Sequence, residues 1–513
     1  MKHKKSLKRI DFMNLVGKHP YLLTIVICLL LVVVYPDSQT EWFLPFLTPA
    51  QFWILLALPL LLAGGIYLYI SKKLDDRLTA LLLMGMGFCL RVGYILATPY
   101  YRRQHDVGYL TDGDGHAGYI AYLYENLHLP DFDVREVWQF YHPPLHHSIA
   151  AAWMRLQTAC GISFEHAGEG VQLLTLGYSC LCMVIFYRIL RHFRLKGAAM
   201  AIPLAIIAFH PTFILLSGSI NNDILSITFM LASVLLTLQW YRNPRPLTIL
   251  KLALTIGLGM LTKLSAWMVA PAAATAFLIV LYRNRRKPIL YIGQYAMFGV
   301  VCIPLGIGWE IRNFLGWGVP IAYVPMLSSN SVQYVGNISI FQRIFDFSPK
   351  QWLYVYNCFE MYGQPYNEYN PLIGLFKTAM FDERINTEMF PNIFGFGETL
   401  FFSQILLAVL TIAAAVGVFR RRSACIELNE KLMLTTTYAI TLISYYIFCY
   451  VYAHVCTQNI RYATPLIFIG CLFLGLRMRS KQHSRLLRII TGVVTAIFAA
   501  SSCIVYACVC FGS

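Results

Sequence analysis

The residues best suited to chemistry gather in one polar stretch, at about residues 99–170. Its candidate bases are Asp106, Asp112 and Asp114. Histidines and tyrosines follow closely, and these are His116, Tyr119, Tyr141, His142, His146 and His147. Carboxylates and histidines exchange protons near neutral pH, so their density here is typical of a site for general acid–base chemistry.

Cations that could hold a phosphate lie at the ends of apolar runs or beside this stretch. Lys263 interrupts a long apolar run, Arg461 opens another, and Arg102 and Arg103 begin the polar stretch itself. Arginine can grip phosphate oxygens with two N–H groups, whereas lysine acts as a point charge. Such cations and a carboxylate base suit transfer of a group from a phosphate to a hydroxyl acceptor.

A metal is the alternative use of these side chains. His142 and His146 have the i,i+4 spacing of metal-binding pairs and could share an ion with the aspartates. The two prolines between them disfavour a regular helical arrangement of the pair. A phosphate leaving group has no obligatory need of a metal, so no cofactor is predicted to be required, and a divalent metal is the alternative.

Each motif also has a structural explanation. The Asp-Gly-Asp-Gly sequence from Asp112 suits a turn and a helix start, since Asp caps helices and Gly takes left-handed conformations. Asp223 could cap a helix, and Lys263 could extend its ammonium to the membrane surface. What favours chemistry is that all of these residues fall on one side once the chain is threaded through a membrane.

The elements that must position these residues are membrane-spanning helices. The chain is 58% hydrophobic and 13% charged over 513 residues, whereas soluble domains are nearer a quarter charged. Apolar runs of about 20 residues, enough to cross a bilayer, recur along most of it. Lys and Arg cluster between the runs, so the net charge of +16 indicates cytoplasmic loops near anionic membrane lipids and not nucleic-acid binding.

The Lys and Arg bias predicts a multi-pass protein of the cell membrane with about 13 spans and a cytoplasmic N-terminus. The predicted units are a tail with two extra spans at 1–77, a membrane core at 78–308 that includes the external loop 99–170, a second external loop at 309–399, and C-terminal spans at 400–513.

Two segments decide where the polar residues fall. The next span, at about 171–190, ends in a cluster of Arg and Lys residues, which predicts that its end is cytoplasmic and its start is outside. Segment 143–160 therefore does not cross the membrane and should lie along its outer surface. The run at 247–282 is too long for one span and should break at Lys263, which places this cation at the outer surface.

The motifs and their order along the chain resemble those of the GT-C fold glycosyltransferases. The resemblance is to the protein O-mannosyltransferases and the lipid A aminoarabinose transferases in particular. The similarity covers about residues 78–480. It rests on the acidic motif Asp112 to Ile120, the aromatic-Pro turn Phe140 to His147, Asp223 at the start of a span, the hairpin Gly257 to Lys263, and Arg461, Tyr462 and Pro465. The expected fold class is therefore an all-α polytopic membrane protein of GT-C type, with a long catalytic first loop that contains juxtamembrane helices.

The resemblance implies a membrane glycosyltransferase that moves a sugar from a polyprenyl-phosphate donor to a lipid, glycan or protein acceptor at the extracytoplasmic face. It implies a first-loop aspartate as base, with Asp114 the first choice and Asp106 its nearest competitor. The Glu that usually follows this Asp is absent, so Asp112 also stays a candidate. The implied phosphate-binding residues are Lys263, Arg461, Arg102 and Arg103, and the implied substrate contacts are His116, Tyr119, Tyr141, His142, His146, His147 and Asp223.

A transporter or flippase of lipid-linked sugars is the alternative function, and a scaffold that binds lipid carriers without chemistry is a third class. Transporters often carry broken helices at matching positions of two inverted halves. Here the apolar run around Lys263 is interrupted, without a counterpart in the second half. The tight acidic–histidine cluster argues against a scaffold.

Overall fold

The structure is a computed structural model that describes residues 48–102, 106–352, 355, 368–382, 393–420, 426–479 and 485–511. Over these residues it is helical, with no strand longer than an isolated bridge. The predicted all-α polytopic fold class is confirmed. Arg103 and the first predicted span, at about 20–36, lie outside the described residues.

The helices alternate between long apolar ones and short ones in the connections. The longer ones are α3 (Pro49–Ile70), α4 (Asp76–Ala97), α8 (Gln172–His192), α9 (Ala198–Phe209), α11 (Asp223–Arg242), α12 (Pro246–Thr262), α13 (Ala270–Arg283), α14 (Ile289–Trp317), α17 (Phe396–Phe419), α18 (Leu428–Val451), α19 (Pro465–Arg479) and α20 (Arg485–Val509). The others are α5 (Gly115–Asn126), α6 (Leu145–Ala159), α7 (Phe164–Glu169), α10 (Pro211–Gly218), α15 (Ile340–Phe345), α16 (Pro371–Phe381) and the 3-10 turns η1 (Leu264–Val269), η2 (Pro349–Trp352), η3 (Ile393–Gly395), η4 (Val455–Thr457) and η5 (Ile460–Tyr462).

In the described part of the chain, nine helices are long and apolar enough to cross a membrane, or ten if the bent pair α9–α10 is one span. The predicted number of about 13 is not confirmed. Helices α12 and α19 lie where spans were predicted but have only 17 and 15 residues. A helix of that length is short for a hydrocarbon core of about 30 Å.

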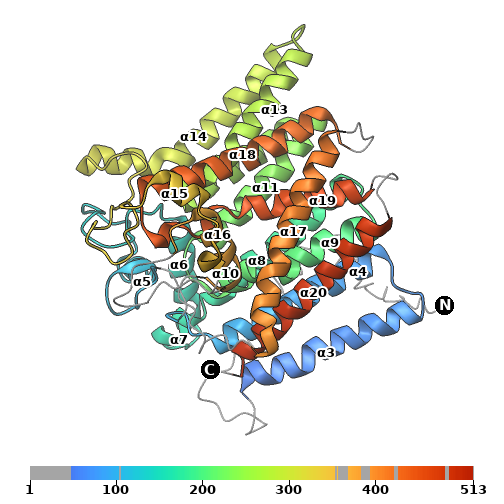
Figure 1. Ribbon diagram of the computed structural model, residues 1–513. Helices are drawn as coiled ribbons and strands as arrows, with labels where there is room; N and C mark the ends of the chain where they lie inside the picture. Colours follow the sequence, from blue (N-terminus) through green and yellow to red (C-terminus); the bar gives the residue numbers. More distant parts are fainter. Residues whose placement is uncertain are drawn as a thin grey trace, which may run out of the picture.

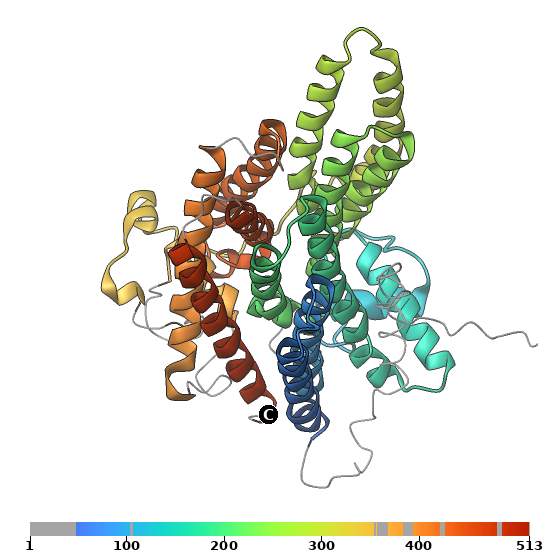
Figure 2. The ribbon, with the colours of Figure 1, turned by 90° about the vertical axis from the view of Figure 1, so that its right-hand side faces the viewer.

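The polar connections lie together at one end of the helix bundle. Figure 1 shows α5, α6 and α7 together at this end. Helix α6 falls within the segment predicted to lie along the membrane surface, and it is not among the helices long enough to cross. Helices α13 and α14 form a hairpin that projects beyond the rest of the bundle in both views (Figure 1, Figure 2).

A sharp bend of 43° separates α9 from α10. Pro211 causes it, because a proline lacks the N–H that would bond the carbonyl four residues earlier. The buried Arg91 of α4 donates hydrogen bonds to the carbonyl oxygens of Ala208 at 2.7 Å and Ile207 at 3.4 Å. A guanidinium thus satisfies backbone groups that could not stay unpaired in an apolar interior.

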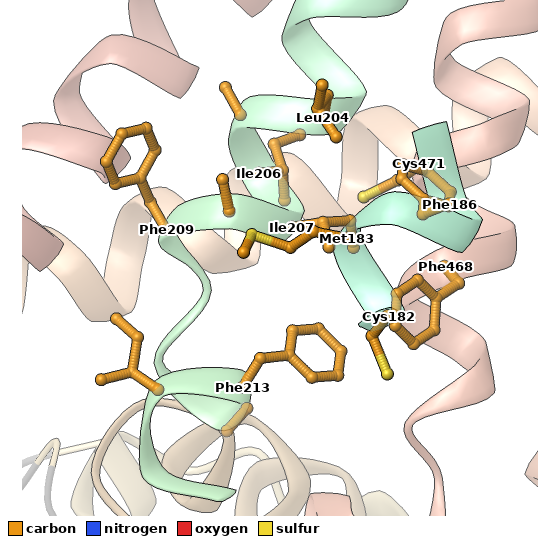
Figure 3. Packing of buried hydrophobic residues seen from close by; sticks show 14 of the residues in the cluster. Cys182, Met183, Phe186, Leu204, Ile206, Ile207, Phe209, Phe213, Phe468 and Cys471 are labelled. Carbon is orange, nitrogen blue, oxygen red and sulfur yellow. The ribbon is translucent and has the colours of Figure 1, made fainter. Parts of the chain in front are cut away.

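Apolar side chains fill the space around this bend. Figure 3 shows Phe209 and Phe213 on either side of the break, with the Phe213 ring turned towards Phe468 of α19 and the Phe209 ring on the other side. The rings of Phe213 and Phe468 are 4.8 Å apart. The bend is therefore a rigid part of the core, and it brings the start of α11 to the same end of the bundle as α5 and α6.

Candidate active site

Four charged side chains from distant parts of the chain meet at this end of the bundle. Arg461 donates from Nη2 to Asp106 Oδ2 at 3.2 Å, and its Nη1 lies 3.6 Å from Asp223 Oδ2. The Lys263 ammonium donates to the other oxygen of Asp223. We call Asp106, Asp223, Lys263 and Arg461 the ion cluster. Asp223 is 2% exposed and Asp106 is 35% exposed, so Asp106 is the carboxylate that a substrate could reach.

The start of α11 and the end of α12 place Asp223 beside Lys263. The Asn222 amide donates to the Thr262 carbonyl oxygen at 2.9 Å, which ties the two helix ends together. Lys263 then takes an extended conformation between α12 and η1 and turns its ammonium to Asp223. The break predicted at Lys263 is thereby confirmed, and an ion pair accounts for the charge at that level of the membrane.

The first turn of α5 places Asp106. The backbone N–H groups of His116 and Ala117 donate to the carbonyl oxygens of Asp106 and Val107 at 2.9 and 2.7 Å. Gly115, with φ +70°, permits this approach, since a Cβ there would lie 2.4 Å from the Val107 carbonyl oxygen. The Asp-Gly-Asp-Gly sequence therefore builds the turn that holds Asp106 in position.

The structure separates the three candidate bases. Asp114 is half-buried at the N-terminus of α5 and makes no side-chain capping bond there. Asp112 is exposed on the preceding turn. Among the described residues, neither forms an ion pair with Lys263 or Arg461, whereas Asp106 does. Arg102 is exposed and also stands outside the ion cluster.

Helix α16 fixes Arg461 through η5, a role that the sequence did not indicate. Thr378 Oγ1 accepts the N–H of Ile460 at 3.0 Å, and Asn459 Oδ1 accepts the N–H of Arg461 at 2.9 Å. Asn459 Nδ2 in turn donates to Asp382 Oδ1 at 3.0 Å. The helix could have been found from Asn370 and Pro371, because an N-cap residue followed by proline is a common helix start.

Thr378→Val should destabilise the segment that carries Arg461 without touching a charged group. Valine keeps the shape of threonine but leaves the buried Ile460 N–H unpaired, at a cost of about 1–3 kcal/mol. We expect a lower thermal-unfolding midpoint for the purified variant than for the wild type. Thr399→Val, at the exposed start of α17, is the matched control and should leave the midpoint unchanged. Equal midpoints for the two variants would show that the Thr378 bond does not help to hold the segment of Arg461.

A wall of stacked rings stands beside the ion cluster. His116 Nδ1 and His147 Nε2 are 2.9 Å apart, and the His116 ring stacks on His142 at 5.2 Å. Tyr119 lies between His147 and Phe140, with ring centroids 4.3 and 4.5 Å away. The first-loop histidines predicted as substrate contacts are therefore brought together, and Tyr141 continues the wall at 4.3 Å from His142.

His146 has a different partner from the other histidines. Its Nε2 donates to the carbonyl oxygen of Ile220 at 2.8 Å, which joins α6 to the chain just before α11. This bond helps to hold the ring wall over Asp223. His146 is fully buried, so its position indicates an anchoring contact.

Acid should destabilise the protein through these buried histidines. Loss of hydration lowers the pKa of His116 and His147 well below 6.5, and that of His146 to about 4. They stay neutral in the fold, whereas the unfolded chain binds protons below about pH 6.5. Stability should therefore fall as the pH drops from about 6.5 towards 4, by about 1.4 kcal/mol per pH unit for each histidine.

Thermal unfolding of the detergent-solubilised protein at pH 7.5 and pH 5 measures this effect. His146→Asn should reduce the difference between the two midpoints, because one buried histidine no longer titrates. His128→Gln is the control, since His128 is exposed in the same loop and should leave the difference unchanged. Equal midpoints at both pH values would contradict the prediction.

No group of three or more His, Cys, Asp or Glu residues arranged to hold a metal ion occurs in the described part of the chain. In the ion cluster the oxygens of Asp223 already face Lys263 and Arg461, and Asp106 faces Arg461. Of the i,i+4 pair His142 and His146, His146 uses its Nε2 for a bond to the Ile220 carbonyl oxygen.

Comparison with known proteins gives a family match and distant structural matches. The model of the family described as dolichyl-phosphate-mannose-protein mannosyltransferase matches residues 141–309, which include Asp223 and Lys263. No curated protein matches the chain significantly.

The solved structures similar to this chain include two of the oligosaccharyltransferase from Archaeoglobus fulgidus. One is archaeal AglB in complex with an inhibitory peptide and a dolichol-phosphate, and the other is tethered via a disulfide bond to an acceptor peptide containing the NVT sequon. Each has 12% identity and a TM-score of 0.48, with 84% of this chain and 55% of the other covered. This chain thus spans little more than half the length of those structures.

The family match lies in the middle of the chain and includes the aromatic-Pro turn from Tyr141 to His147, the start of α11 and the Lys263 break. These are among the motifs on which the resemblance was predicted. Over residues 141–309 the chain is similar to dolichyl-phosphate-mannose-protein mannosyltransferases, and the predicted resemblance to GT-C fold glycosyltransferases is confirmed.

Proposed function

We propose that the protein is a membrane glycosyltransferase that moves a sugar from a polyprenyl-phosphate carrier to a hydroxyl of a lipid, glycan or protein. The convergence of Asp106, Asp223, Lys263 and Arg461 at one end of the bundle carries this proposal. The site would face the extracytoplasmic side of the cell membrane, with the N-terminus in the cytoplasm, as the Lys and Arg bias predicts.

The ion cluster suggests how donor binding prepares the base. Two carboxylates face two cations, so their formal charges cancel before substrate binds. A donor phosphate brings a negative charge and competes with the partly exposed Asp106 for Arg461. Asp106 would then be released from its ion pair next to the donor, where a general base is needed.

The transfer itself would form one bond and break one. The acceptor oxygen attacks the anomeric carbon while its proton passes to Asp106. The bond from that carbon to the carrier phosphate breaks, and the phosphate leaves with the electron pair. Lys263 and Arg461 stabilise the charge that develops on the leaving phosphate, because they are held in place before the reaction.

An apolar cavity beside Arg461 favours a lipid-linked donor over a soluble one. The cavity has a volume of about 330 Å³ and lies among α16, α17, α18 and α19. Its wall includes Ile460, the residue before Arg461, together with Leu375, Leu407 and Leu466. An isoprenoid chain in this cavity would contact Ile460, the neighbour of Arg461 in the chain.

We propose that the reaction requires no metal ion, since Lys263 and Arg461 already face the carboxylate oxygens that would coordinate one. Transfer should therefore persist after treatment with a chelator. If the chelator abolishes transfer and a divalent ion restores it, the cations of the cluster do not suffice and this part of the proposal is wrong.

The direct test is to incubate the purified protein with radiolabelled polyprenyl-phosphate sugars and to look for transfer or slow hydrolysis. Nucleotide sugars are the matched control and should not react, because they lack the isoprenoid chain. Movement of the labelled lipid across a proteoliposome membrane without release of sugar would instead identify a flippase and overturn the proposal.

A further inference from the structure

A second polar feature lies at the far end of α19 from Arg461. It is an open hollow of about 610 Å³ whose charged walls are Arg194, Lys196, Arg479 and Arg488. These cations come from the turn between α8 and α9, the end of α19 and the start of α20. None of the described residues that line the hollow is acidic.

The hollow is separate from the ion cluster. Arg461 precedes α19, whereas Met478 and Arg479 at the end of α19 line the hollow. The 15 residues of α19 span about 22 Å at 1.5 Å per residue. A ligand in this hollow would therefore contact neither Asp106 nor Lys263.

The turn that carries Arg194 and Lys196 is held in a defined conformation. Arg194 and Gly197 have positive φ values of 54° and 53°. The Gly197 N–H donates to Asp76 Oδ1 at 2.8 Å, which ties the turn to the start of α4. The Arg479 guanidinium donates to the carbonyl oxygen of Phe193, so the end of α19 is tied to the same turn. The cations are thus gathered by backbone contacts, although like charges repel each other.

The surroundings match a phospholipid. The floor of the hollow is apolar at Ala198 and Met478. A second hollow between α17, α19 and α20 has a volume of about 270 Å³ and combines the apolar Leu410, Leu474 and Leu487 with Arg420 and Arg477. Both hollows lie where apolar helices end, which is the level of lipid headgroups.

We propose that this basic hollow binds the headgroup of an anionic phospholipid, whose acyl chains lie along α17, α19 and α20. Basic pockets between the ends of membrane helices are suited to such headgroups, because each basic residue near the membrane surface attracts an anionic lipid. The site is independent of the proposed catalytic reaction and would hold the ends of α8, α19 and α20 together.

Native mass spectrometry of the whole protein, released from nanodiscs that contain equal parts of phosphatidylglycerol and phosphatidylcholine, tests the proposal. The wild-type protein should retain phosphatidylglycerol in clear excess over phosphatidylcholine. Equal retention of the two lipids would overturn the proposal. Inorganic phosphate at millimolar concentration should not displace the retained lipid, and displacement would show a site for free phosphate instead.

A charge-matched pair of double variants assigns the retention to this hollow. Arg194→Gln with Arg488→Gln should reduce phosphatidylglycerol retention about tenfold or more, since each basic residue near the membrane contributes roughly fivefold to affinity. Arg286→Gln with Lys287→Gln removes the same charge from the exposed turn between α13 and α14 and should leave retention unchanged. Equal losses in both double variants would mean that net charge, and not the hollow, attracts the lipid. Arg194→Lys with Arg488→Lys should keep the retention, because it keeps both positive charges, and the thermal-unfolding midpoint of the Gln double variant should match that of the wild type.

Discussion

Asp106→Asn should lower the turnover of sugar transfer by roughly 10²–10⁴, the usual contribution of a positioned general base. Asparagine keeps the size of the side chain but cannot accept the proton of the acceptor hydroxyl. Asp106 is the candidate base that the structure joins to Arg461, at 3.2 Å. Donor binding should be unchanged or somewhat tighter, because the phosphate no longer competes with a carboxylate for that arginine. Single-turnover kinetics with a bound radiolabelled donor would separate the two effects.

Asp114→Asn is the matched control for this prediction. Asp114 lies at the start of α5 without an ion pair to Lys263 or Arg461, so its variant should keep turnover within about tenfold of the wild type. The opposite pattern, an inactive Asp114 variant and an active Asp106 variant, would move the role of base to Asp114. Activity in both would exclude these two aspartates as the base and leave the exposed Asp112 as the remaining candidate of the three.

Arg461→Ala should reduce donor affinity by an amount equivalent to about 1.5–3 kcal/mol, the range for hydrogen bonds to charged groups. It should also destabilise the fold by several kcal/mol, because the fully buried Asp223 loses a cation that lies 3.6 Å away. Lipid-carrier titration and thermal unfolding of the purified variant would measure the two losses. Arg461→Lys should restore part of the stability but less of the affinity, since lysine cannot bridge two groups as a guanidinium does.

Arg102→Ala is the control for Arg461, because Arg102 is an exposed cation at the start of the first loop and lies outside the ion cluster. It should change neither donor affinity nor stability appreciably. Unchanged donor affinity in Arg461→Ala, with a loss in Arg102→Ala, would contradict the proposed phosphate clamp. The clamp would then have to be sought near the start of the first loop.

The bundle could be predicted largely from local sequence. Apolar length marks the long helices. The ends of α4, α11, α17 and α18 fall within a few residues of spans that apolar length and the Lys and Arg bias predict at about 78–98, 224–241, 400–419 and 432–452. The break at Lys263 was also predictable, because a lysine is costly in the middle of a hydrocarbon core and therefore marks the end of a helix. The short length of α12 and α19 was less evident from the sequence, since it depends on how these helices pack against their neighbours. The bend at Pro211 was also less evident, because the distant Arg91 provides the hydrogen bonds that the backbone loses there.

The site could be predicted only in part. The sequence pointed to Lys263, Arg461, Asp223 and the first-loop histidines, and the structure brings these residues to the same end of the bundle. It did not indicate α16, which fixes Arg461 through Thr378 and Asp382. Nothing in an 11-residue apolar segment tells which distant backbone its threonine will bond.

The sequence by itself determined the kind of the elements and the types of side chain available for chemistry, but not the number of spans. These follow from hydrophobic length and from the bias of Lys and Arg, which act over the span of a single helix. Only the tertiary structure decided which aspartate of the first loop meets the cations. Asp106 and Arg461, which make this contact, are 355 positions apart in the chain. Their contact depends on how α5, α11 and η5 pack together, and a local sequence pattern contains no information on that packing.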